Sequence, residues 1–187
     1  MIRRIVLAAV IAILAACVAG FLSAGRACAH DPRFACSPRH ASNPVKIADP
    51  QKSWAFYGHL VPGETDHYIF TTQEPLRVPW SILLDERDER NPARPVVTLY
   101  AADGKVRDRL DLKDPTRFYE PFSQEHYITS RDRSIELSPG TYSAVVSMSG
   151  GRMPQRYTFA IGEAERFGLF EIPYVAGAVL RVRSLRY

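Results

Sequence analysis

Apolar side chains alternate with polar ones in several short runs of this 187-residue chain. Successive residues of a β-strand point to opposite faces of the sheet, so such alternation is typical of a strand with one buried face and one wet face. The runs at residues 76–84, 142–148 and 157–161 show it. They predict antiparallel sheet, because antiparallel strands commonly cover a core with one face and meet water with the other.

Turn signals separate these runs. Asp103-Gly104 stands between two further candidate strands, residues 96–100 and 106–112, which is typical of a β-hairpin, and Pro139-Gly140 precedes the run at residues 142–148. Residues 53–162 contain no segment with convincing helical periodicity. We therefore predict an all-β fold for residues 53–162, an antiparallel β-sandwich of about eight strands.

The N-terminus predicts export. Arg3 and Arg4 precede residues 5–16, a run without a polar side chain, and this order is typical of a secretory signal. A helix over residues 5–24 is long enough to cross a hydrocarbon core of about 30 Å. Residues 1–29 are thus predicted to be a signal peptide, a lipoprotein signal or a membrane anchor. In each case residues 30–187 lie at the periplasmic or extracellular face of the cytoplasmic membrane.

Three fates of this segment remain open. Leu14-Ala15-Ala16-Cys17 resembles a bacterial lipobox, which predicts lipidation of Cys17. Ala27-Cys28-Ala29 has the small residues of a cleavage site. The segment can also stay uncleaved as an anchor. Lipidation or retention is favoured because either leaves an even number of cysteines in the exported part.

That even pair is Cys28 and Cys36, for which we predict a disulfide in an oxidising compartment. With His30 and His40 the two cysteines also form a C-x-H-x5-C-x3-H pattern. Structural zinc sites typically have closer Cys-x2–4-Cys pairs, so a disulfide is preferred and no metal site is predicted. Residues 30–52 are rich in proline and are expected to form a tether.

Three groups of residues, in the same order along the chain, resemble the motifs of bacterial pre-peptidase C-terminal (PPC) domains. The residues are Gly58-His59-Leu60, Gly63, Asp66, Tyr68 and Phe70; Val97-Thr98-Leu99-Tyr100 and Asp103-Gly104; and Leu137–Tyr142, Val146 and Tyr157-Thr158-Phe159. The resemblance covers roughly residues 54–161. It implies an exported, non-catalytic β-sandwich of jelly-roll type, a domain usually appended to secreted hydrolases. The chain departs from the family pattern in the charged insert at residues 85–94 and after Gly162.

Residues 163–187 form a distinct tail. Its apolar residues recur near helical spacing, and Arg181, Arg183 and Arg186 follow them. We expect a short helical or apolar tail packed on the sandwich. The alternative is an interfacial helix with its apolar face in lipid and its arginines at anionic headgroups.

No motif for catalysis stands out in the chain. It has no G-x-S-x-G, H-E-x-x-H or P-loop pattern. The charged run at residues 85–90 is expected to be a solvated loop, because its arginines neutralise its carboxylates. Glu64 and Asp66 are a possible calcium pair, whereas His59 and His67 are read as surface histidines. The chain is predicted to be neither an enzyme nor the holder of a cofactor or metal.

Aromatic residues are densest at residues 118–127. Exposed aromatic side chains near strand ends can stack on sugars or grip a peptide. Phe118, Tyr119, Phe122 and Tyr127 are therefore the predicted ligand-binding residues. The alternative is that these side chains close one end of the hydrophobic core.

The basic charge carries little information about partners. The formal net charge is +4, but Arg3, Arg4 and Arg26 lie in the targeting segment, and only +1 remains without them. Nucleic acid is excluded as a partner, because the remaining arginines are interspersed with acids. We expect a membrane-associated binding or interaction module of the cell envelope, with an envelope protein, peptide or glycan as partner. A structural envelope protein is the alternative, and a hydrolase with an unrecognised site ranks third.

Overall fold

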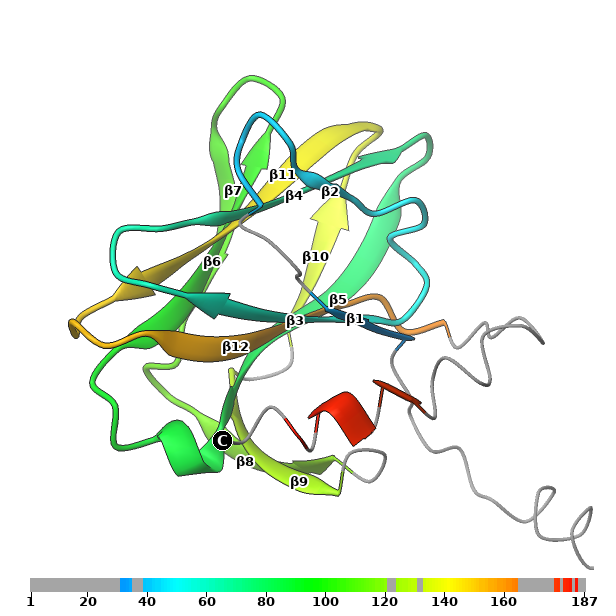
Figure 1. Ribbon diagram of the computed structural model, residues 1–187. Coiled ribbons are helices and arrows are strands. Elements are labelled where there is room, and N and C mark those ends of the chain that lie inside the picture. Colours follow the sequence, from blue (N-terminus) through cyan, green and yellow to red (C-terminus); the bar gives the residue numbers. More distant parts are fainter. Residues whose placement is uncertain are drawn as a thin grey trace, which may run out of the picture.

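The computed structural model describes residues 31–34, 39–120, 124–130, 133–164, 177–178, 180–182 and 184. Two β-sheets face each other across one hydrophobic core (Figure 1). Aromatic rings from both sheets meet there: the ring of Tyr68 lies 4.9 Å from that of Phe56 and 5.1 Å from that of Phe159. The architecture is the predicted β-sandwich.

The larger sheet has seven strands. Their order is β1 (Asp31–Phe34), β3 (Trp54–Leu60), β12 (Gln155–Ile161), β5 (Leu76–Asp85), β9 (Glu125–Thr129) and β8 (Thr116–Glu120), with β10 (Arg133–Leu137) also paired to β5. Trp80 of β5 pairs with both β10 and β12, and Leu83 pairs with both β9 and β12. Strands β9 and β10 therefore share the edge of β5 that lies opposite β12.

The smaller sheet has five strands, in the order β2 (Val45–Lys46), β4 (Asp66–Thr72), β11 (Gly140–Ser149), β6 (Arg94–Ala101) and β7 (Val106–Leu110). The alternation read from the sequence corresponds to burial. Along β5, Val78, Trp80, Ile82 and Leu84 are buried in the core. Each sheet thus turns one set of alternate side chains inward, as a period of two requires.

The structure corrects two features of the predicted sandwich. Both sheets are mixed rather than purely antiparallel, because β1 pairs with β3, and β2 with β4, in parallel. The described residues also form twelve strands, more than the eight expected. The additional strands β1 and β2 lie within the range predicted to be a tether. They were missed because β2 has only two residues and β1 contains Pro32, which is unusual within a strand.

Strand β1 is held by a buried ion pair. The Asp31 side chain is fully buried, and its carboxylate lies 2.8 Å from the Lys52 ammonium and 2.9 Å from the Arg33 guanidinium. The backbone N–H of Asp31 also donates to the carbonyl of Ser53. These contacts tie the first described residues to the start of β3.

A second buried carboxylate connects the two sheets. Asp66 at the start of β4 accepts hydrogen bonds from the Tyr157 hydroxyl of β12 and from the backbone N–H of Arg39. The Tyr157 proton goes to the carboxylate, so the Tyr68 hydroxyl, 2.8 Å away, donates to the Tyr157 oxygen. The guanidinium of Arg39 lies 4.8 Å from the Tyr68 ring centroid. The buried charge is thereby surrounded by donors and by a cation, which limits the cost of its desolvation.

Gly58 makes room for this cluster. It pairs with Tyr157 across β3 and β12, and a Cβ atom at Gly58 would lie 2.3 Å from the Tyr157 ring. Only a residue without a side chain lets the ring cross the strand and reach Asp66. Gly58, Asp66, Tyr68 and Tyr157 all belong to the PPC-like motif, so the structure gives that pattern a physical reason.

The described part of the chain contains no helix long and apolar enough to cross a bilayer. Cys17, Cys28 and Cys36 lie outside the described residues, and so does the whole N-terminal segment. In the tail, the described residues 177–178, 180–182 and 184 are helical. Ala178 is buried, and the Arg181 guanidinium lies 4.6 Å from the ring of Phe34 in β1.

We predict that Gly58→Ala lowers the free energy of unfolding by about 1–3 kcal/mol, because the added methyl group pushes the Tyr157 ring away from Asp66. Urea unfolding of the purified full-length protein measures the change. Gly177→Ala is the control, since a Cβ atom there meets nothing within 4 Å. Equal stability of Gly58→Ala and the wild type would contradict the proposed role of Gly58.

The pH dependence of stability gives a second prediction. Burial, and then the charge of Asp66, raises the pKa of Tyr157 well above its ordinary value of 10.0. The folded protein therefore holds this proton more tightly than the unfolded chain. The associated stabilisation is complete below a pH of about 10 and is lost as the pH rises above that value.

Tyr157→Phe should lower the free energy of unfolding at neutral pH by about 1–3 kcal/mol, because Asp66 loses a donor. The variant should also lose less stability between pH 9 and 11 than the wild type does. Denaturant unfolding across this pH range tests both statements, with Tyr119→Phe at an exposed tyrosine as the control. An unchanged slope above pH 10 would refute the assignment.

Candidate functional site

The outer face of the seven-stranded sheet is its face opposite the core. It is formed by the alternate residues that point away from the sandwich, such as Ala55, Ser81 and Ala160. Over this face lies a cavity of about 560 Å³, which we call the outer-face cavity. A second cavity of about 450 Å³ adjoins it, and Tyr57, Tyr127 and Thr158 line both. The two hollows flank these three residues along β3, β9 and β12.

The floor of the outer-face cavity is hollow because its side chains are small. It consists of outward residues of β3, β5 and β12 and the segments beside them: Ser53, Ala55, Ser81, Thr158, Ala160 and Gly162. Leu83, Tyr127 and Ala160 also form a small apolar cluster separate from the main core. The cavity therefore offers an apolar centre beside hydroxyl groups, and four charged residues also line it: Arg117, Glu120, Arg133 and Glu163.

Strand β8 forms the opposite wall. Its register with β9 sets Thr116 against Thr129, Phe118 against Tyr127 and Glu120 against Glu125. Paired residues share a face of the sheet, so Thr116, Phe118 and Glu120 face the cavity beside Tyr127. In Figure 1 the β8–β9 hairpin lies below β12, on the outer side of the sheet.

The predicted aromatic residues divide between the two faces of this hairpin. Phe118, which is 40% exposed, and Tyr127, which is 5% exposed, line the same cavity. Tyr119 lies on the other face of β8, where its ring centroid is 5.0 Å from that of His126. Phe122 lies outside the described residues. The structure thus brings together two of the four, and their ligand-binding role remains a prediction.

The charged run beyond β5 is more organised than the solvated loop expected. Residues Glu86–Asp88 form the 3₁₀ turn η1, and the Asp85 side chain accepts from the backbone N–H of Arg87 at 3.0 Å. The Arg87 side chain also donates to the Asp85 carboxylate, and its guanidinium lies 3.0 Å from Glu125 of β9. The turn therefore holds one end of β9.

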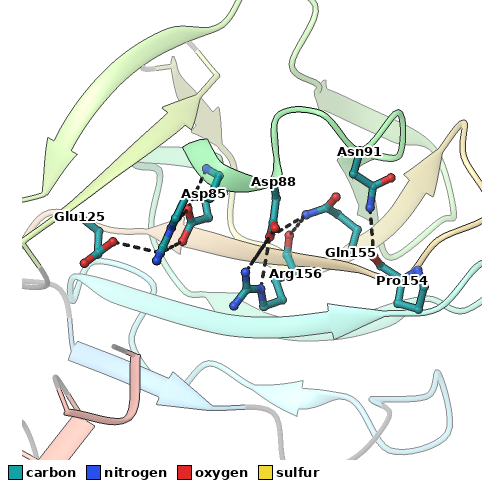
Figure 2. A network of polar contacts seen from close by, with 8 residues as sticks. Asp85, Asp88, Asn91, Glu125, Pro154, Gln155 and Arg156 are labelled. Atoms are coloured by element: carbon teal, nitrogen blue, oxygen red, sulfur yellow. Dashed lines mark hydrogen bonds and ion pairs between the residues drawn. The ribbon is translucent and has the colours of Figure 1, made fainter. Parts of the chain in front are cut away.

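The same turn contacts two further strands. Asp88 accepts from Arg156 of β12 at 3.1 Å and from the Gln155 amide at 3.3 Å (Figure 2). Arg117 of β8 pairs with Glu86, and its guanidinium lies 3.1 Å from Glu89. We call this set of ion pairs the η1 brace. It fixes β8, β9 and β12 around the end of the cavities that contains Asp85.

Two groups at this end have shifted pKa values. Burial alone would raise the pKa of Asp85, but the hydrogen bonds and charge of Arg87 outweigh it and hold the pKa below its ordinary value of 3.8. Burial, followed by Tyr127 and Glu120, raises the pKa of Tyr57 well above 10.0. Asp85 is thus a carboxylate and Tyr57 a neutral phenol at neutral pH.

The residues weighed for metal binding serve other contacts. Asp66 is occupied by Tyr157 and Arg39, and Glu64 accepts from the backbone N–H of Val61 at 3.4 Å. The His67 ring lies 3.0 Å from the Thr65 hydroxyl. Among the residues that the structure describes, no group of three or more His, Cys, Asp and Glu side chains is placed to hold a metal ion.

Sequence reasoning missed the floor and the η1 brace. Ala55, Ser81 and Ala160 carry no signal in a sequence, because small residues on a strand suit many environments. Arg117 lies 28 residues along the chain from Glu89, and Arg156 lies 68 residues from Asp88, so no local sequence pattern identifies these ion pairs. Only the register of the sheet brings them to η1.

No family model and no curated protein matches this chain. Among solved structures, it is similar to the pre-peptidase C-terminal domain of a collagenase from Bacillus anthracis, with 15% identity, a TM-score of 0.44 and coverage of 68% of this chain and 99% of that chain. This domain belongs to the family that the sequence motifs resemble.

Two further solved structures are similar to the chain. One is a periplasmic inhibitor of g-type lysozyme from Salmonella Typhimurium, with 16% identity, a TM-score of 0.39 and coverage of 64% of this chain and 96% of that chain. The other is a surface-associated copper-binding protein of Methylomicrobium album BG8, with 11% identity, a TM-score of 0.31 and coverage of 73% and 99%.

The η1 brace gives a prediction about order in β8. Arg117→Ala should speed amide hydrogen exchange in Thr116–Glu120, because the strand loses its pairs with Glu86 and Glu89. The free energy of unfolding should change by less than about 1 kcal/mol, since these pairs are exposed. Exchange mass spectrometry measures the effect. Arg107→Ala, at an exposed arginine of β7, is the control, and equal exchange in β8 of the two variants would contradict the role of the brace.

Proposed function

We propose that this protein is a non-catalytic binding module of the cell envelope and that its ligand occupies the outer-face cavity. One observation carries the proposal: Phe118 and Tyr127 stand over a floor of small residues and enclose a cavity of about 560 Å³. Ligand sites are typically hollows of this size with an apolar lining and a few polar groups.

The exposure of Phe118 supports a ligand at this place. This large apolar side chain is 40% exposed beside a hollow. A ligand that covered it would remove apolar surface from water, which lowers the free energy of the complex. The η1 brace supports the proposal as well, because walls fixed by ion pairs lose little freedom on binding. The hollow therefore combines an apolar contact with an ordered frame.

The location outside the cytoplasmic membrane belongs to the same proposal. It is supported by the paired arginines and the apolar run at the N-terminus. Retention at the membrane through this segment, with or without lipid on Cys17, and a jelly-roll course of the strands complete the proposed description. Nothing in the proposal requires a catalytic group.

A capture experiment with the tagged, full-length protein in native membranes tests the proposed function. We expect a partner to copurify reproducibly with the wild type and to be reduced roughly tenfold by Phe118→Ala, the usual scale for a residue at the centre of an interface. Tyr119→Ala is the matched control, because this neighbouring aromatic residue of β8 points away from the cavity. Circular dichroism establishes that both variants are folded.

Equal capture by the wild type and by Phe118→Ala would refute a ligand in the outer-face cavity. Equal loss in both variants would refute it too, because Tyr119 does not line the cavity. A partner retained by both variants would instead favour the structural alternative, in which the sandwich holds other proteins through another surface.

A further inference from the structure

The edge strands of the two sheets are not alike. A strand at a sheet edge presents unpaired N–H and C=O groups to which another strand can add, and proteins commonly block such edges with proline, bulges, charge or very short strands. Edge strand β1 contains Pro32, and β2 has two residues. Strand β7 carries a bulge, since Leu99 and Tyr100 pair with Asp108 and Val106.

Strand β10 is blocked in a different way. Its Arg133 reaches across to the other sheet, where the guanidinium lies 3.4 Å from the Asp108 carboxylate and donates to the carbonyl of Arg109 at 3.2 Å. A polypeptide approaching β10 at this end would have to displace both contacts.

Among the described residues, strand β8 has neither a proline nor a bulge, and its two charged residues, Arg117 and Glu120, stand on either side of two aromatic residues. It pairs with β9 in regular register over its five residues, from Thr116 to Glu120, and it ends the order of the seven-stranded sheet. Phe118 and Tyr119 on it are 40% and 49% exposed. It is a regular, aromatic edge strand beside the outer-face cavity.

The direction of the β8 side chains selects the kind of ligand. A strand added to β8 would continue the sheet, and its own side chains would alternate between the same two faces. Thr116, Phe118 and Glu120 face the cavity, so every second side chain of the added strand would face it too. The apolar cluster of Leu83, Tyr127 and Ala160 in the cavity suits an apolar or aromatic side chain.

The edge is also held in place for such an addition. Arg117 of β8, which also lines the cavity, is fixed by Glu86 and Glu89. An added strand would pair with backbone that is already ordered, which reduces the entropy lost on binding.

We propose that the ligand is an extended polypeptide segment that adds as a strand to the outer edge of β8 and places alternate apolar side chains in the outer-face cavity. This inference rests on the proposed function and names the ligand class. Main-chain hydrogen bonds to β8 supply affinity, and the cavity selects the side chains. A glycan has no regular row of amides to form this ladder.

Defined peptides test the inference without altering the protein. Random dodecapeptides displayed on phage are selected on the full-length protein in detergent micelles, and the selected peptides are then synthesised. Each peptide is also made with a single N-methyl group at each position in turn. Dissociation constants are measured by fluorescence anisotropy.

Strand addition predicts a periodic result. N-methylation at every second residue should weaken binding about tenfold or more, because only alternate N–H groups of an edge-paired strand face the neighbouring strand. Methylation at the intervening residues should change affinity by less than about threefold. Phe118→Ala should weaken binding of the unmodified peptide, and Tyr119→Ala should leave it unchanged.

Other results would overturn the inference in distinguishable ways. Peptides that lose affinity at no position, or equally at all positions, would refute strand addition. If they still depended on Phe118, the proposed function would stand. Selection of no peptide, together with capture of a membrane partner that depends on Phe118, would refute a peptide ligand alone.

A second copy of the chain is another possible occupant of the edge. Concentration-dependent dimerisation in analytical ultracentrifugation that is abolished by Phe118→Ala would overturn the peptide inference in favour of self-pairing. If Phe118→Ala retained every binding activity of the wild type, the proposed function itself would be refuted.

Discussion

A buried carboxylate, that of Asp66, joins the two sheets. Asp66 in the smaller sheet accepts from Tyr157 in the larger, and a charge in this position is tolerated only while its donors stay in place. Tyr157 reaches it only because Gly58 has no side chain. This requirement fixes β3, β4 and β12 relative to one another, and β3 and β12 are the strands whose opposite face forms the floor of the outer-face cavity.

The site therefore depends on two kinds of electrostatic contact. On the core side, hydrogen bonds shielded from water align the strands. On the outer side, the ion pairs of the η1 brace, which are exposed at Arg117 and half-buried at Arg156, hold the β8–β9 hairpin against β12. Between them lies a surface of small side chains, which leaves a hollow where a typical sheet would carry larger residues. The proposed binding function follows from this difference in side-chain size.

The sequence predicts the central strands well and the edges poorly. Val78, Trp80, Ile82 and Leu84 recur at every second position of a long strand, so the sequence predicts the buried face of β5. Strands β1 and β2 are short and parallel to their neighbours, and no local sequence pattern predicts them. Aromatic density draws attention to Phe118 and Tyr127, but only the β8–β9 register separates these two from Tyr119. The η1 brace joins residues far apart in sequence. From the sequence alone, a run of mixed charge is therefore predicted to be solvated, and only the arrangement of the strands shows which arginines its acids contact.

The exposure of the η1 brace has a consequence for the environment of the protein. Ion pairs in contact with water weaken as salt accumulates, since the screening length falls from about 10 Å at 0.1 M to about 3 Å at 1 M ionic strength. The buried pair of Asp66 with its donors is shielded from this effect. A medium of higher ionic strength would therefore loosen the β8–β9 hairpin while the sandwich beneath it stayed intact, so that ionic strength would set how rigid the proposed recognition edge is.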